Sequence, residues 1–153
     1  MSTNGFTCNA SSEYSPNHAC GKTYDSNVGS EWATRNEGAG AWIEIKFPAY
    51  AQLSKIETKH RFGGRFSGEN FKDIILSFSN NTTQSVCLKD GTDPEWNVIE
   101  INPSVKTKSL KISAMSAHER YGFNPGFSEI KFYTCPGMSR KYPKSNLAWF
   151  YAF

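Results

Sequence analysis

The sequence is a succession of short runs in which apolar and polar residues alternate one by one. In the run Ala41–Phe47, positions 43, 45 and 47 are Ile, Ile and Phe, whereas Glu and Lys occupy positions 44 and 46. A period of two is typical of a β-strand with one face in a hydrophobic core. No segment shows the apolar spacing of an amphipathic helix. Six further runs are predicted strands: Leu53–His60, Phe71–Ser79, Gln84–Asp90, Trp96–Asn102, Ser109–Met115 and Ser128–Cys135.

Turn-forming residues separate these runs and predict how the strands are connected. Gly, Pro, Asn, Asp and Ser are frequent in the intervals, as in RFGGRFSGEN and KDGTDPE, and Pro48 is expected to end the first strand. Many short strands joined by turns predict an all-β fold, an antiparallel β-sandwich or jelly roll. Such a fold gathers its loops at two ends, so we expect the function to reside at one end.

The length indicates one domain, followed by a tail of different character. The chain of 153 residues is long enough for a single domain with its own core, and we place that domain at residues 1–137. The tail, residues 138–153, joins basic side chains to a cluster of aromatic residues and is too short to span a membrane. It either lies at a membrane interface, packs on the domain or leads into a longer protein.

Charge and motifs argue against two classes of function. The 17 basic and 14 acidic residues give a net charge of +3, and the lysines are scattered rather than gathered into the dense basic face of a nucleic-acid-binding protein. We therefore expect no nucleic-acid partner. The sequence contains neither HExxH nor GxSxG, and GGRFSG lacks the Lys-Ser/Thr ending of a Walker loop. We therefore expect a protein without catalytic activity.

Four cysteines stand at positions 8, 20, 87 and 135, and none of them forms a C-x-x-C pair. This spacing argues against a zinc site and leaves disulfides or buried thiols, with three complete pairings open. Cys87 is either free or paired with Cys20. Glycosylation sequons at Asn9, Asn80 and Asn81 point to an extracellular or cell-surface protein.

Several segments occur in an order that resembles a known family. They are ASSEYS (10–15), KTYDSNVGSEW (22–32), GAWIEIKFPAYAQLSKIE (40–57), FKDIILSFS (71–79), KSLKISAM (108–115) and FSEIKFYTC (127–135). Together they resemble the coagulation factor V/VIII C-domain family, also called discoidin-like domains, within the galactose-binding jelly-roll superfamily. The resemblance runs from about Cys8 to Cys135 and implies the same β-sandwich.

The resemblance also implies how the ends of the domain are joined. In the family the first and last strands lie side by side, and a disulfide often ties the ends together, which here implies a bond between Cys8 and Cys135. The first cysteine stands closer to the ASSEYS segment than the family usually places it, so Cys20 is a rival partner for Cys135. Trp32 and Trp42 fall at positions that are mostly in the core in this family.

The segment YDSNVGSEW carries a candidate calcium site. Asp25, Asn27 and Ser30 supply carboxylate, amide and hydroxyl oxygens in a tight turn, as a hard cation such as Ca²⁺ requires. In carbohydrate-binding members of the superfamily the matching turn holds a structural calcium with help from an acidic residue of the last strand, which here would be Glu129. The alternative is an Asx turn without an ion, in which Asp25 caps backbone amides.

Two loops carry the side chains that we expect to bind a ligand. HRFGGRFSGEN (60–70) offers two arginines, a histidine and an amide, and AHERYGFNPG (117–126) precedes the last predicted strand. The resemblance implies that both loops reach one end of the sandwich, where His, Arg or Asn side chains and an aromatic platform hold a sugar. The predicted ligand-binding residues are His60, Arg61, Arg65, Asn70, His118, Arg120, Tyr121, Phe123 and Asn124.

Two functions of different classes are consistent with these loops. The first is a lectin-like module that binds cell-surface or extracellular glycans, with Tyr121 or Phe123 stacked on the sugar ring. The second is a cell-adhesion module that binds a protein receptor or an anionic phospholipid surface through Phe62, Phe66, the loop arginines and the aromatic tail. Ionic strength separates the lipid-binding form from the first function, because binding to anionic lipid weakens with salt and binding to a neutral sugar barely changes.

Overall fold

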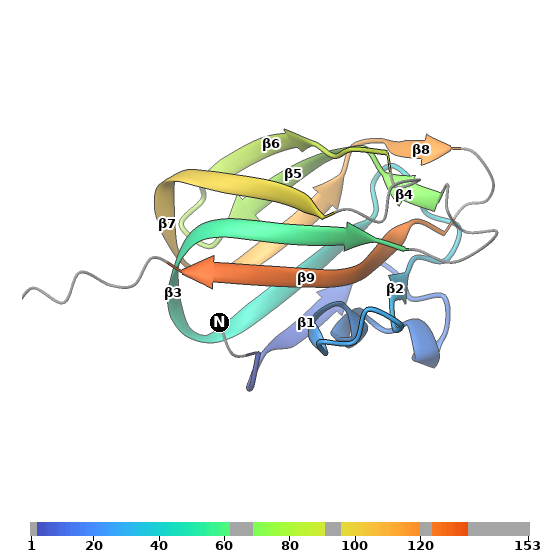
Figure 1. Cartoon of the computed structure of the whole chain (residues 1–153), viewed down its shortest axis with the longest axis horizontal. Coiled ribbons are helices and arrows are strands. Elements are labelled where there is room, and N and C mark those ends of the chain that lie inside the picture. Colours follow the sequence, from blue (N-terminus) through green and yellow to red (C-terminus); the bar gives the residue numbers. More distant parts are fainter. Residues whose placement is uncertain (1–2, 62–68, 91–95, 120–123, 135–153) are drawn as a thin grey trace, which may run out of the picture.

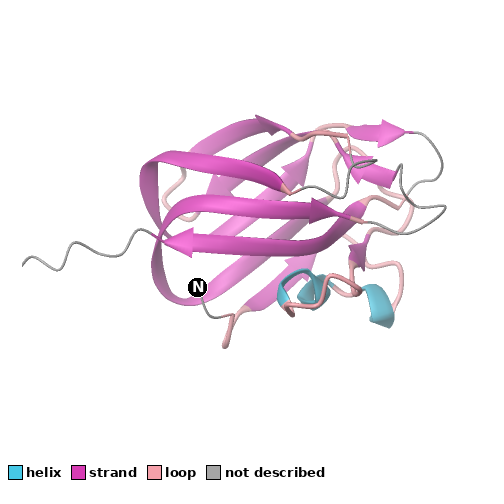
Figure 2. Cartoon of the chain, viewed as in Figure 1, coloured by secondary structure: helices cyan, strands magenta, loops and turns pink. Residues whose placement is uncertain are grey.

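The structure is a computed structural model that describes residues 3–61, 69–90, 96–119 and 124–134. In this described part the chain is mostly strand, with two short 3-10 helices, and no helix is long and apolar enough to cross a membrane (Figure 1, Figure 2). The helices are η1 (Pro16–His18) and η2 (Cys20–Tyr24). The strands are β1 (Thr7–Ala10), β2 (Trp32–Ala33), β3 (Trp42–His60), β4 (Glu69–Phe71), β5 (Asp73–Phe78), β6 (Thr83–Cys87), β7 (Asn97–Ala114), β8 (Ala117–Glu119) and β9 (Gly126–Thr134).

The strands form an antiparallel sandwich, and its longest strands run through both layers. The larger sheet has the order β2-β9-β3-β7-β5-β6, with β1 also paired to β3, and β4 and β8 form a second sheet of two strands. β3 pairs with β1 through residues 43–46 and with β9 through residues 53–60, so it passes from one layer to the other. Figure 1 shows β3 and β7 turning back at the same end of the molecule, on the left. The predicted all-β sandwich is confirmed.

The predicted end of the first strand at Pro48 is wrong. The predicted strands 41–47 and 53–60 are the two halves of β3, and those at 96–102 and 109–115 are the two halves of β7. β3 continues across Pro48 because residues 47–50 have no partners in β7, so the missing N–H of proline removes no hydrogen bond from the ladder. The pattern did not predict β1, β2, β4 and β8, since strands of two to four residues are too short to show a period.

Alternate residues of the strands build the core. The side chains at positions 43, 45 and 53 of β3 have no exposed surface. Trp32 is also fully buried, with its ring centroid 5.8 Å from that of Phe71 and 6.2 Å from that of Phe127. Trp42 lies on the opposite face of β3, half-buried under the Lys111 ammonium, which is 4.3 Å from the ring centroid. The core prediction is therefore confirmed for Trp32 and wrong for Trp42.

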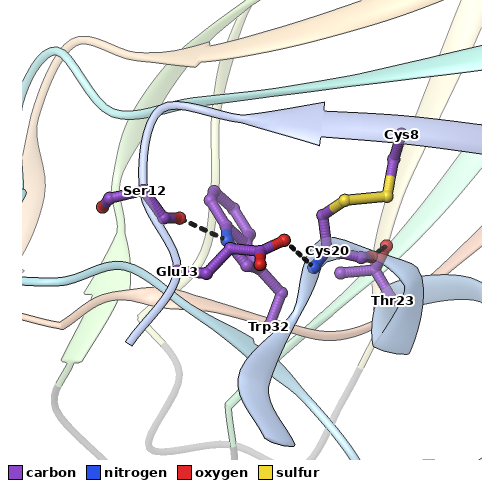
Figure 3. The surroundings of a disulfide bond; sticks show 6 residues. All are labelled: Cys8, Ser12, Glu13, Cys20, Thr23 and Trp32. Carbon is purple, nitrogen blue, oxygen red and sulfur yellow. Dashed lines mark hydrogen bonds between the residues drawn. A yellow bond between two sulfur atoms is a disulfide. The ribbon is translucent and has the colours of Figure 1, made fainter. Parts of the chain in front are cut away.

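The disulfide joins β1 to η2 rather than to the end of the domain (Figure 3). Cys8 in β1 is bonded to Cys20, the first residue of η2, with 6.1 Å between their Cα atoms. The predicted pairing of Cys8 with Cys135 is wrong, because β1 pairs with the first half of β3, whereas β9, which leads to Cys135, pairs with the second half. Among the described strands β1 and β9 are not neighbours in the sheet. Cys135 lies outside the described residues, and Cys87 is exposed on β6 with a free thiol.

Candidate functional site

Five of the predicted ligand-binding residues lie in the described part of the chain, and the structure brings them to one end of the sandwich. They are His60 at the end of β3, Arg61 after it, Asn70 in β4, His118 in β8 and Asn124 before β9. Asn70 is paired with His118 across β4 and β8, and Arg61 donates a hydrogen bond to the Asn124 carbonyl. The remaining predicted members lie outside the described residues: Arg65, Arg120, Tyr121 and Phe123.

Arg61 is held inside the protein by two carboxylates. Only 3% of the surface of Arg61 is exposed. Nη1 donates to Glu69 Oε2 at 2.8 Å and to the Asn124 carbonyl, and Nη2 donates to Glu31 Oε1 at 2.7 Å. Glu31 Oε1 is also 3.7 Å from His18 Nε2. The guanidinium thus joins the end of β3 to three other segments: β4, the segment before β2 and the segment before β9. Through Glu31 the contact extends to His18 in η1.

His60 forms part of the floor beneath the loops. It is 3% exposed, and its ring stacks on Phe127 with 6.0 Å between centroids and an interplanar angle of 18°. Nε2 lies 3.0 Å from the Lys89 carbonyl, which accepts a hydrogen bond when Nε2 carries the proton. Burial lowers the pKa of His60 to about 4, so the imidazole is neutral at pH 7. The ring therefore packs and donates one hydrogen bond within the protein.

Asn70 and His118 differ in how far they reach the surface. Asn70 has no exposed surface, and neither polar atom of its amide has a hydrogen-bond partner among the described residues. His118 is half-buried, with Nε2 3.5 Å from the Leu88 carbonyl. A buried amide without partners costs about 1–3 kcal/mol, so native proteins usually satisfy such a group with a further residue, a water or a ligand. Asn70 marks a polar position at the base of the predicted binding loops.

The turn with the predicted calcium ligands is an Asx turn whose side chains hydrogen-bond to one another. Asp25 Oδ1 accepts a hydrogen bond of 2.9 Å from the Asn27 N–H, and Asn27 Oδ1 accepts one of 3.0 Å from the Gly29 N–H. Ser30 Oγ donates to Asp25 Oδ2 at 2.7 Å. These contacts gather carboxylate, amide and hydroxyl oxygens within one exposed turn. The turn is therefore self-supporting, and its oxygens are of the type that a hard cation binds.

Glu129 faces this turn from β9. It is 3% exposed, its Oε2 atom has no hydrogen-bond partner among the described residues, and the backbone of Ser26 in the turn hydrogen-bonds to its carboxylate. Burial, with the nearby charge of Asp25, raises the pKa of Glu129 to about 7. The described residues contain no cluster of three His, Cys, Asp or Glu side chains that could hold a metal. The donor set nevertheless fits Ca²⁺, which accepts hydroxyl and carbonyl oxygens beside two carboxylates.

Glu129 and the turn 25–30 border a surface hollow. Its volume is about 380 Å³, and Ser26 and Val28 of the turn line it together with residues 129–133 of β9. The turn that carries the predicted calcium ligands Asp25, Asn27 and Ser30 thus contacts Glu129 through the Ser26 backbone, although about a hundred residues of sequence separate the two.

The residues of the alternative, adhesion-type function are mostly outside the described part of the chain. Phe62, Phe66 and the tail 138–153 are not described, and Arg61 is buried in ion pairs. β9 ends at Thr134, close to the domain boundary at residue 137 that the sequence predicts. That boundary stays a prediction.

Solved structures with the same fold include several carbohydrate-binding modules. The family 32 carbohydrate-binding module of NanJ from Clostridium perfringens, in complex with galactose, is 14% identical, with 83% of this chain and 92% of that chain covered and a TM-score of 0.69. CpGH89CBM32-5 from the same organism, in complex with GalNAc-β-1,3-galactose, is 18% identical, with 84% and 95% covered and a TM-score of 0.65. A fucose-binding module of Streptococcus pneumoniae is 22% identical, with 86% and 95% covered and a TM-score of 0.63.

The sequence itself matches a family model. No curated protein matches the chain significantly. The model of the F5/8 type C domain matches residues 7–125, which is most of the chain and extends from β1 to the residue before β9. This match agrees with the resemblance that the ordered segments indicated. The chain belongs to the F5/8 type C domain family.

Proposed function

We propose that the protein is a non-catalytic carbohydrate-binding module of the lectin type, which recognises cell-surface or extracellular glycans. The observation that carries this proposal is the convergence of His60, Arg61, Asn70, His118 and Asn124, from separate segments, at one end of the sandwich. The solved structures of similar fold support it, because those modules bind galactose, GalNAc-β-1,3-galactose and fucose. A galactose-like or related sugar is the proposed ligand.

The buried and the half-buried residues have different proposed roles. Arg61 and His60 form a rigid floor, since both are 3% exposed and hydrogen-bonded within the protein. His118 and Asn124 are half-buried and are the described side chains proposed to contact the sugar. Arg65 and Arg120 are proposed as further donors to sugar hydroxyls, and Tyr121 or Phe123 as the ring on which the apolar face of the sugar stacks. This division keeps binding on the loops and stability in the floor.

Calcium is proposed as a structural ion at the turn 25–30. Asp25, Asn27, Ser30 and Glu129 would hold it, and the orphaned Oε2 atom of Glu129 supports this assignment. A bound cation would neutralise two neighbouring carboxylates and fix the turn against β9. An extracellular or cell-surface location is also proposed, because disulfides such as Cys8–Cys20 persist in oxidising compartments.

A glycan array, followed by titration of the sugars that bind, tests the proposed function. We expect Tyr121→Ala and Arg120→Ala to weaken binding about tenfold or more, because each removes a stacking or hydrogen-bonding partner of the sugar. Glu100→Ala, at an exposed position of β7 that belongs to neither loop, is the control and should bind as the parent does. An array without hits on the folded parent, or loop variants that bind as well as the parent, would refute the proposal.

A further inference from the structure

The end of the sandwich opposite to Arg61 carries a bulge that exposes an aromatic ring. Between Lys46 and Ala51 five steps along β3 face only two steps along β7, from Ser109 to Thr107. The surplus residues leave the ladder, and Tyr50 among them is 65% exposed, more than any other large hydrophobic residue in the described part. A ring with so much exposed surface contributes little to the core and remains available for contacts.

Two lysines of β7 flank this ring. Lys106 and Lys108 are exposed, and the buried Thr107 between them points to the core, so both lysines lie on the outer face. Their Nζ atoms are 5.4 Å and 6.0 Å from the centroid of Tyr50. In a β-strand, residues two positions apart are separated by roughly 7 Å, so the two ammonium groups form a short row beside the ring.

A hollow of about 260 Å³ adjoins the row, bordered by Lys46, Phe47, Ser79, Lys108 and Ser109. Two lysine and two serine residues border it, its lining surface is mostly apolar, and no carboxylate belongs to the described residues that line it. Ser79 is fixed in place, because its Oγ accepts a hydrogen bond of 2.8 Å from the Lys108 N–H. The hollow is therefore a mostly apolar recess beside the two lysines, built by three different segments: β3, β7 and the residue after β5.

The positive charge of this end is only partly compensated. Lys46 Nζ is 3.7 Å from Glu44 Oε2, and this is the ion pair that the described residues provide for these lysines. Lys106 and Lys108 have no ion pair with a described carboxylate. Lysine is a compact, strongly hydrated charge that suits phosphate, sulfate and carboxylate groups at an exposed surface. The exposed lysines therefore fit an anionic ligand.

The neighbouring ring selects among anionic ligands. A sugar ring presents an apolar face that packs on Tyr50, while a sulfate or carboxylate on the same sugar reaches the lysines. A bilayer would require apolar side chains that insert into it, and this surface offers only Tyr50. The other exposed large hydrophobics of the described part lie elsewhere in the fold: Tyr14, Val28, Val98 and Met115.

We propose that Tyr50, Lys46, Lys106 and Lys108 form a second binding surface, specific for an acidic polysaccharide. It lies at the end where β3 and β7 turn back, away from β4 and β8 and the proposed sugar-binding loops (Figure 1). The surface is independent of the first site, because the two share no residue. A chain with both sites joins a neutral sugar at one end to an anionic polymer at the other.

Binding to immobilised dextran sulfate, with unsulfated dextran as the blank, tests the proposal. Lys106→Ala/Lys108→Ala should weaken binding about tenfold or more, because it removes two charge-assisted contacts. Tyr50→Ala should weaken it as well, and Lys106→Arg/Lys108→Arg should retain it. The matched control is Lys72→Ala/Lys131→Ala, which changes the net charge equally at two exposed lysines outside the surface and should bind as the parent does.

Two results would overturn the proposal. One is equal weakening in the control and in Lys106→Ala/Lys108→Ala, which would mean that only net charge matters. The other is a parent that does not bind dextran sulfate; if that parent binds vesicles containing phosphatidylserine instead, the surface is assigned to a membrane. Galactose binding, measured on the same variants, should not change. Failure of the sugar-binding proposal and failure of this one are therefore distinguishable.

Discussion

At the scale of single residues, Arg61 shows how a side chain that resembles a ligand donor is used for structure. Its guanidinium contacts Glu69, whose side chain is 5% exposed, and Glu31. We predict that Arg61→Met lowers the free energy of unfolding by about 3–5 kcal/mol, because it leaves a buried carboxylate without its partner. Urea unfolding measures this loss. Arg35→Met, at an exposed arginine, is the matched control and should cost less than about 1 kcal/mol; equal losses in both variants would contradict the role of Arg61.

His60 predicts a pH dependence of stability. Its pKa is lowered from 6.5 to about 4 by burial, so between these values the unfolded chain binds a proton that the folded chain excludes. The stabilisation is complete above pH 6.5 and is lost as the pH falls toward 4, by about 3 kcal/mol in total. Urea unfolding from pH 7 to pH 4.5 should show a steeper loss for the parent than for His60→Gln. Parallel curves for the two proteins would contradict the buried, neutral imidazole.

At the scale of elements, the contact between β2 and β9 depends on a glycine. Gly126 pairs with Ala33, and a Cβ atom at position 126 would lie 1.9 Å from the Trp32 carbonyl oxygen. Gly126→Ala should therefore separate the two strands and destabilise the fold by more than about 3 kcal/mol. Gly38→Ala is the control, since its Cβ would meet Ala117 at an ordinary 3.8 Å. Thermal unfolding compares the two variants, and similar midpoints would refute the predicted clash.

The disulfide between β1 and η2 gives a second prediction for an element. Glu13 accepts a hydrogen bond from the Cys20 N–H, and the Thr23 hydroxyl donates one to the Cys20 carbonyl (Figure 3). These hydrogen bonds hold η2 in place in addition to the disulfide. Cys8→Ser/Cys20→Ser should cost about 2–4 kcal/mol in the free energy of unfolding and should leave the fold intact. Peptide mapping of the non-reduced parent should find Cys8 joined to Cys20. A peptide pair containing Cys8 and Cys135 would contradict the structure.

The turn 25–30 and β9 predict a response to calcium. At a hundredfold excess over its dissociation constant the ion would add about 2.7 kcal/mol, which for a domain of this size raises the unfolding midpoint by roughly 5–10 °C. Glu129→Gln should abolish this shift, and Glu100→Gln, at an exposed glutamate of β7, should preserve it. Calorimetry with calcium and with a chelator measures both. An unchanged midpoint of the parent would refute the proposed ion.

At the scale of the whole molecule, the sequence predicted the sandwich because most of its strands alternate strictly. It did not predict that β3 and β7 run through both layers, since Pro48 is an ordinary strand terminator unless a bulge removes its partner. The alternation of apolar and polar residues also could not predict the pairing of Cys8 with Cys20 or the burial of Arg61. Both depend on contacts between distant segments, such as Arg61 with Glu31, and a local period carries no information about these contacts.

The central claim is that the end of the sandwich around Arg61 binds a sugar. Titration of isotope-labelled protein with galactose, followed by amide chemical shifts in NMR, tests it directly because it locates the ligand. We predict that the shifts cluster at Asn70, His118 and Asn124 and that the amides around Tyr50 and Lys106 do not move. An absence of shifts at millimolar galactose, or shifts confined to the opposite end, would contradict the account.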